Sequence, residues 1–152
     1  MLERNASGPD MNPLRFEELT REESLRRLGS VRVGRIVFTH QALPTVRPVN
    51  HVVDGGAVIL RTHPGAALLS AVDTVVAYEA DSVSDGERIG WSVIVTGVAR
   101  RLRGTADVER YERLLRPSVP DEMEYVIRIH AELISGFSLI EENGALPQGA
   151  PS

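Results

Sequence analysis

Three groups with anion-binding chemistry follow one another between residues 61 and 66. They are the guanidinium of Arg61, the hydroxyl of Thr62 and, after Pro64 and Gly65, the start of a short apolar helix expected over Ala66 to Val72. A helix N-terminus offers unpaired amides and a partial positive charge, which a phosphate prefers. The sequence therefore predicts a phosphate site. The alternative is an exposed strand arginine followed by an ordinary N-cap threonine, with no ligand.

A β-hairpin is the element expected to position these groups. Two apolar runs flank the Gly-Gly pair at 55–56, a strong local signal for a two-residue turn. If the two glycines form the loop, Asp54 pairs with Ala57, and the same register sets Asn50 opposite Arg61. Because directly opposed residues share a face of the sheet, Asn50 and Arg61 are expected to lie side by side.

Length and composition favour one compact, soluble domain. The chain has 152 residues, 42% of them hydrophobic, which is enough for a real core. The formal net charge of -4 argues against a nucleic-acid-binding face, and the absence of cysteine excludes disulfides, thiolate catalysis and Cys-based zinc sites. The first 13 residues lack the apolar centre of a signal peptide, and no apolar run approaches the ~18 residues of a membrane span. We expect a cytoplasmic protein without a membrane partner.

The order of the expected elements indicates a mainly β protein. One domain is expected over 14–141, between flexible tails at 1–13 and 142–152. The predicted helices are Thr20 to Leu28, with a Thr20–Glu23 capping box, and Thr105 to Arg116. Strands with only short helices between them, and no repeating βαβ pattern, predict an antiparallel barrel. Besides the hairpin, the predicted strands are Val31 to Thr39, Thr74 to Asp81, Ile89 to Leu102, Met123 to Leu133 and Ser135 to Glu141.

Several positions within these strands carry more specific expectations. Gly34 suggests a bulge or a bend at a barrel corner, and Pro48, which cannot donate to a ladder, suggests an edge, a bulge or a ligand. Ser82 to Glu87 is predicted to be a polar loop. Ile89 to Leu102 is apolar on both faces, which is typical of a strand inside a barrel or against a partner subunit.

The motifs, taken in order, resemble those of the pyridoxamine 5'-phosphate oxidase-like, FMN-binding split-barrel family, near its small flavin-nucleotide-binding and nitroimidazole-resistance-type members. The resemblance spans about Leu25 to Leu102. The residues that carry it are Leu28-Gly29, Gly34-Arg35-Ile36, Pro44 to Asn50, Leu60-Arg61-Thr62 with Pro64-Gly65, Glu79-Ala80-Asp81, Gly90 to Val93 and Thr96-Gly97.

The resemblance implies a homodimer of split barrels with a flavin at each of two interface clefts. The isoalloxazine would lie along Arg47, Pro48, Val49 and Asn50. The phosphate would be held at the segment Leu60, Arg61 and Thr62, which is also the anion site predicted from the residues themselves. Trp91 and Ser92 match a segment near the flavin, contributed by the other subunit; for Trp91, a core or dimer-interface role is an equal alternative.

One position departs from the family pattern. Members often carry a lysine that clamps the phosphate, and Ala67 occupies that place here. Losing one charge-assisted hydrogen bond costs ~1.5–3 kcal/mol, or roughly one to two decades of affinity. The consequences left open are weak FMN binding, replacement of the lysine by another arginine, or a different flavin such as the deazaflavin F420.

A flavin supplies its own redox chemistry, so no catalytic acid or base is required, and no catalytic residue is assigned. The four histidines show no metal-binding spacing, and no Gly-x-Ser-x-Gly elbow or nucleotide-binding glycine loop is present. The function expected from the resemblance is a dimeric FMN-dependent oxidoreductase acting on a small molecule. The alternatives are an F420-dependent reductase on the same barrel and a flavin-storing or flavin-sensing module without turnover.

Overall fold

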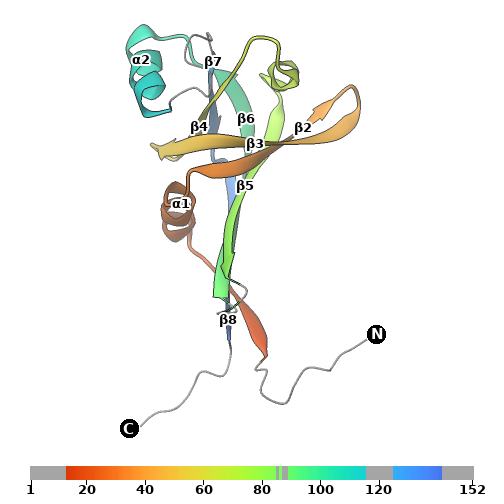
Figure 1. The fold of residues 1–152 in the computed structure, drawn as a ribbon, viewed down its shortest axis with the longest axis vertical. Helices are drawn as coiled ribbons and strands as arrows, with labels where there is room; N and C mark the ends of the chain where they lie inside the picture. The colour runs from red at the N-terminus through yellow and green to blue at the C-terminus, as the bar shows by residue number, and fades with distance from the viewer. Residues whose placement is uncertain (1–12, 85, 87–88, 116–124, 142–152) are drawn as a thin grey trace.

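The structure, a computed structural model, describes residues 13–84, 86, 89–115 and 125–141 (Figure 1). Within these residues no helix has the length and apolar composition that a bilayer span requires. The elements are β1 (Leu14–Glu18), α1 (Arg21–Gly29), β2 (Val33–His40), β3 (Leu43–Asp54), β4 (Ala57–Thr62), the 3-10 helix η1 (Ala67–Ala71), β5 (Val75–Ser84), β6 (Ile89–Arg101), α2 (Thr105–Leu114), β7 (Tyr125–His130) and β8 (Leu133–Glu141).

Six of the strands close into an antiparallel barrel. Hydrogen-bonded neighbours run β6-β5-β2-β3-β4-β7, and β7 closes the ring by pairing with Ala99 to Arg101 of β6. The preceding part of β6 pairs instead with β8, which carries β1 on its other edge. Figure 1 shows α2 near one end of the molecule and the β1–β8 region at the opposite end. The predicted fold class, a mainly β antiparallel split barrel with short helices, is confirmed.

The barrel interior is the main hydrophobic core. Alternate residues of β4, β6 and β7 point inward, as the period of two along a strand requires. Helix α2 covers the outer face of β4 and β7, where Tyr111 and Leu115 pack on Ala57, Ile59 and Val126. Helix α1 lies over the barrel with Leu28 fully buried. The largest fully buried side chains of the interior are Tyr78, Leu28, Ile36, Leu60, Ile127, Ile129, Val58, Val93 and Val95.

The start of α1 is the predicted one. Thr20 is the N-cap, and its side-chain oxygen accepts a hydrogen bond of 3.1 Å from the backbone amide of Glu23. The carboxylate of Glu23 contacts Arg26 and Arg27 on the next turn. The side-chain cap at Thr20 thus holds the first turn of a nine-residue helix.

Gly34 does not mark the predicted bulge. The pairing of β2 with β3 is uninterrupted, with Gly34 opposite Val49. A Cβ atom at Gly34 would instead lie 2.5 Å from the hydroxyl of Tyr78. The glycine is needed because the Tyr78 ring packs directly on the β2 backbone.

Two predicted boundaries are also wrong. Met123 to Leu133 is not one strand, because β7 ends at His130. The backbone amide of the next residue, Ala131, donates a hydrogen bond to the carbonyl of Gly56 in the β3–β4 turn. Leu133 then starts β8, while Met123 itself lies outside the described residues. The chain can approach β6 so closely here because Gly97 has no side chain. A Cβ atom at this position would lie 2.0 Å from the carbonyl oxygen of His130. Likewise, the predicted polar loop after Asp81 begins later, since β5 continues to Ser84.

Candidate functional site

Six of the ten residues predicted to hold a cofactor line one cavity. This cavity has a volume of about 430 Å³ and lies between the first half of β3, the end of β4 and η1. The cavity is within the range, roughly 300–1,000 Å³, of small-molecule sites. The predicted residues that line it are Arg47, Pro48, Val49, Arg61, Thr62 and Ala67, and they are joined by His63, Gly65, Ala66 and Leu68.

The cavity lies where β3 and β4 part. The Gly-Gly turn sets Asp54 opposite Ala57 as predicted, but the ladder ends at the pair His51–Leu60. Beyond it, Asn50 pairs with Val33 of β2, and β4 continues against β7. The predicted pair between Asn50 and Arg61 is therefore not formed. Two strands that share a turn and then follow different neighbours leave a wedge between them, and this wedge is the cavity.

Pro48 belongs to the part of β3 that β4 has left. It pairs with Arg35 of β2 on one edge, and the β3–β4 ladder stops before it on the other. A proline at this position costs no ladder hydrogen bond on the side of the cavity. The described residues support the strand-edge interpretation, and because Pro48 also lines the cavity, the ligand interpretation stays a prediction.

Arg61 reaches the cavity wall with its direction fixed. Its Nη1 donates to the backbone carbonyl of Leu115 at 2.6 Å and approaches that of Glu112 at 3.4 Å, both in the last turn of α2 or just after it. Carbonyls at a helix C-terminus lack intrahelical donors and bind arginine readily. These two bonds hold the guanidinium of Arg61 against the end of α2.

The predicted helix start is a weaker feature than expected. The segment after Gly65 forms a 3-10 helix of five residues, Ala67–Ala71, and its N-cap, Ala66, makes no side-chain capping bond. Thr62 is thus not an N-cap; it is the last residue of β4 and only 7% exposed. One short 3-10 turn carries little macrodipole, so the positive charge of the cavity comes from its arginines.

The other predicted site residues lie elsewhere in the chain's own fold. Leu60 is fully buried inside the barrel. Asn50 lines a separate cavity of about 300 Å³ beside α1 and the end of α2. Trp91 is 9% exposed, packs in the barrel core and borders a third cavity near β8. Ser92 pairs with Phe137 on β8. Within one chain, these four residues are separate from the Arg47–Arg61 cavity.

A buried polar pair behind the cavity was not found from the sequence. The hydroxyl of Tyr78 donates to Nδ1 of His51 at 2.5 Å and lies 3.2 Å from the carbonyl oxygen of Val49, a residue of the cavity wall. Nε2 of His51 donates to the carbonyl of Leu28 at 2.8 Å. Burial lowers the pKa of His51 and raises that of Tyr78, so both side chains stay neutral. Gly34, which makes room for the tyrosine ring, was the only local signal.

The described residues offer no arrangement for metal chemistry. Among them, no group of three histidine, aspartate or glutamate side chains lies close enough to hold an ion. The residues that line the cavity include two arginines, a threonine and a histidine together with apolar residues such as Pro48, Val49 and Leu68. This combination suits a ligand with a flat apolar part and an anionic end.

Comparison with known proteins gives a consistent result. Residues 20–138 match the family model described as pyridoxamine 5'-phosphate oxidase. The uncharacterized protein Rv0080 of Mycobacterium tuberculosis is 46% identical over 132 residues, which are 83% of this chain and 87% of that protein.

Solved structures agree with the sequence matches. An FAD-binding protein from Mycobacterium smegmatis is 36% identical and superposes with a TM-score of 0.68, covering 80% of this chain and 95% of its own. An FAD-binding protein from Mesorhizobium loti, 19% identical, shares the fold with a TM-score of 0.64 over 85% of this chain and 100% of its own.

Proposed function

This chain belongs to the pyridoxamine 5'-phosphate oxidase family, and from that premise we propose that it binds a flavin in the cavity between β3, β4 and η1. The observation that carries the proposal is that Arg47, Arg61 and Thr62 line one cavity together with apolar residues. The description of a relative as an FAD-binding protein supports the same ligand class.

The residues of the cavity fit the two ends of a flavin nucleotide. Guanidinium groups bind phosphate through charge-assisted hydrogen bonds, often two at a time. Arg61, oriented by the end of α2, and the hydroxyl of Thr62 bind the phosphate. Pro48, Val49 and Leu68 line the apolar part, where a ring system is shielded from water.

Arg47 takes the role of the lysine that Ala67 replaces. The Arg47 side chain is exposed, and its Nη1 donates only to the carbonyl of the preceding residue among its bonds to described atoms, at 2.9 Å. It lines the same cavity as Ala67. A second guanidinium compensates for the missing ammonium, so a phosphorylated flavin, FMN or FAD, remains the expected cofactor in preference to the deazaflavin F420.

The reaction we assign is a flavin-dependent oxidation or reduction of a small molecule. A bound flavin supplies electron and hydride transfer, while the protein supplies position and electrostatics. Backbone groups of Val49 and its neighbours on β3 orient the ring edge. The buried pair of His51 and Tyr78 supports β3 from the side of the barrel core, through the hydrogen bonds of the tyrosine hydroxyl. A flavin-storing module without turnover is the second candidate function. It is compatible with a cavity in which no residue is assigned as a catalytic acid or base.

A second copy of the chain completes the site. The outward face of β5, β6 and β8 carries large apolar side chains, among them Leu133 (69% exposed), Val75 (64%), Ile94 (42%) and Phe137 (39%). Ser92 lies on this same face, opposite Phe137. A homodimer that buries this face would bring Ser92 toward the partner's cavity, as the family resemblance implies.

Titration of the purified chain tests the flavin site. Apo-protein is titrated with FMN, riboflavin and F420, followed by flavin fluorescence. FMN should bind more tightly than riboflavin, and Arg61→Gln and Arg47→Gln should each weaken FMN roughly 10- to 100-fold while changing riboflavin little. Arg100→Gln is the matched control, since Arg100 is 62% exposed and pairs with Asp73 on the outside. If no flavin binds, or FMN affinity is unchanged in both variants, the proposed site is wrong.

Turnover is tested on the loaded protein. Bleaching of the bound flavin by NADH or NADPH, and its recovery on adding an oxidant, would support the oxidoreductase. A tightly bound flavin that none of these reagents reduces would favour the storage module instead.

A further inference from the structure

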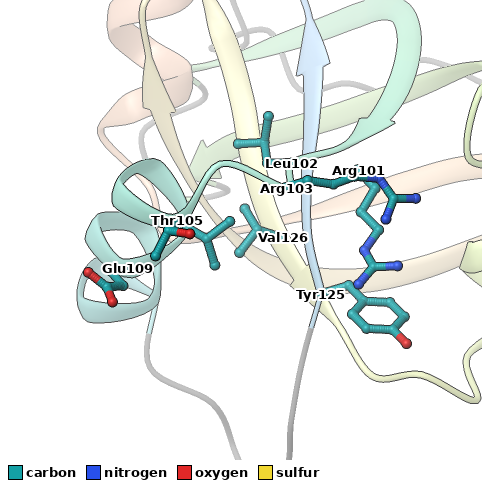
Figure 2. Close-up of a pocket in the computed structure, with 8 residues that line it drawn as sticks. Arg101, Leu102, Arg103, Thr105, Glu109, Tyr125 and Val126 are labelled. Carbon is teal, nitrogen blue, oxygen red and sulfur yellow. The ribbon is translucent and has the colours of Figure 1, made fainter.

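Helix α2 is anchored to the barrel at its C-terminal end. Tyr111 is the buried residue of the helix, and Leu115, directly after the helix, is buried as well; both pack on the outer face of β4 and β7. Figure 2 shows Val126 of β7 pointing toward α2, whereas Tyr125 lies on the other side of that strand. Nearer the start of the helix, a cavity of about 360 Å³ lies between α2 and the ends of β6 and β7. The last turn of α2 is therefore the part that the barrel holds in place.

The end of α2 also carries the carbonyl groups that bind Arg61. Nη1 of Arg61 donates to the carbonyl of Leu115 at 2.6 Å and to that of Glu112 at 3.4 Å. Arg61 lines the flavin cavity from the end of β4. The direction in which its guanidinium points therefore depends on the position of these two carbonyls, and so on where α2 ends.

A polar cluster of Asp54, Arg110 and Tyr111 joins the same part of α2 to the β3–β4 hairpin. The hydroxyl of Tyr111 donates to Oδ2 of Asp54 at 2.5 Å, and Nη2 of Arg110 donates to the same carboxylate oxygen. The bond from Tyr111, followed by that from Arg110, lowers the pKa of Asp54, and the bond to Asp54 raises the pKa of Tyr111. At neutral pH the acceptor is therefore charged and the tyrosine keeps its proton. Hydrogen bonds to a charged acceptor are stronger than those between neutral groups.

These contacts connect α2 to both ends of β4. Asp54 lies just before the turn that leads into the strand, and Arg61 lies next to the last residue of the strand. β4 pairs with β7 along its whole length and with β3 as far as Leu60, so the distance between its two ends is fixed. Tyr111 and Leu115 are one helical turn apart, and the amide of Leu115 donates to the carbonyl of Tyr111 at 2.8 Å. The hydrogen bond at Asp54 thus holds the turn from which Arg61 takes its direction.

We propose that Asp54 and Tyr111 are positioning residues of the flavin site, which act on Arg61 through the last turn of α2. The inference rests on the flavin site proposed above. Without the bond between Asp54 and Tyr111, Arg61 keeps its charge, but its guanidinium is no longer held in one direction. Ordering one long side chain when the ligand binds then lowers the affinity roughly two- to tenfold. The effect is confined to ligands that carry a phosphate, because Arg61 binds that group.

The test compares FMN with riboflavin, which lacks the phosphate, on the full-length chain. Affinities of the apo-protein for both are measured by fluorescence titration in Tyr111→Phe and Asp54→Ala, each alone and combined with Arg61→Gln. Glu23→Ala is the matched control, because it also removes a carboxylate with arginine partners, but one that lies on α1 and pairs within that helix. Urea unfolding reports the stability of each variant.

Tyr111→Phe and Asp54→Ala should each weaken FMN roughly two- to tenfold and leave riboflavin unchanged, whereas Glu23→Ala should change neither. In the Arg61→Gln background neither variant should weaken FMN further, because the residue through which they act is gone. Unchanged FMN affinity in either single variant, a loss that persists without Arg61, or equal losses for FMN and riboflavin would overturn the inference while leaving the flavin site intact. A chain that binds neither flavin would overturn both.

Discussion

Tyr78 and His51 are joined inside the barrel by a hydrogen bond of 2.5 Å, from the tyrosine hydroxyl to Nδ1 of the imidazole. The other imidazole nitrogen donates to the carbonyl of Leu28 at the end of α1. His51 is also the first residue of β3 that pairs with β4. The pair therefore connects α1, β3 and β5 beside the proposed flavin cavity, and the Tyr78 hydroxyl also lies 3.2 Å from the carbonyl oxygen of Val49 in its wall.

Removing the tyrosine hydroxyl should weaken the fold and the site together. Tyr78→Phe leaves Nδ1 of His51, a buried acceptor, without its donor, which costs about 1–3 kcal/mol of unfolding free energy. Urea unfolding followed by circular dichroism measures the change. Tyr111→Phe, which removes a hydroxyl bonded to Asp54 near the surface, is the control and should cost about 1 kcal/mol or less. A smaller loss in Tyr78→Phe than in the control would contradict this account.

Gly34→Ala should destabilise the barrel by about 1–3 kcal/mol, because its Cβ would lie 2.5–2.6 Å from atoms of the Tyr78 ring and hydroxyl. The clash should disappear when the ring is removed. In a double-mutant cycle, Gly34→Ala added to Tyr78→Val should therefore cost less than Gly34→Ala alone, measured as unfolding free energies in urea. Gly86→Ala, where a Cβ would meet nothing within 4 Å, is the matched control. If the losses of unfolding free energy in the two single variants simply add up in the double variant, Gly34 is not needed to make room for the Tyr78 ring.

The stability of the fold should fall as the pH is lowered from neutrality. Burial lowers the pKa of His51 below its ordinary value of 6.5, which the side chain regains on unfolding. Between 6.5 and the lower native pKa, the unfolded chain binds more protons than the native one, so the unfolding free energy decreases with falling pH, by at most about 1.4 kcal/mol per pH unit from this group. Urea unfolding between pH 7.5 and 5 measures the slope. His51→Gln should show a shallower slope; an identical slope would assign the effect to other groups.

A charge on the outward face of β6 should separate the proposed dimer. Ile94→Glu places a carboxylate among Leu133, Phe137 and their copies in the partner, where burying it unpaired costs several kcal/mol. Size-exclusion chromatography with light scattering should then give the mass of one chain. Leu114→Glu, at an exposed apolar residue of α2, should leave the mass of the unaltered protein unchanged. A monomeric unaltered chain would exclude the homodimer.

The sequence was sufficient to predict features that depend only on residues close together in the chain. The Gly-Gly pair determines the turn and the pairing of Asp54 with Ala57, and the Thr20 cap determines the start of α1. The convergence of Arg47, Arg61 and Thr62 was expected from the family resemblance rather than from spacing, and the described structure does place these residues on one cavity.

Only the tertiary structure determined where β3 and β4 of the hairpin separate. Each strand can pair with other strands that lie far away in the sequence, and these pairings replace the local one. Asn50 pairs with Val33, and Arg61 pairs with Val126, 65 residues further along, so the local register stops at His51. The direction of Arg61 likewise depends on a carbonyl 54 residues away in sequence. Hydrophobic periodicity reveals which face of a strand is buried, but it does not identify the strand that will occupy each edge.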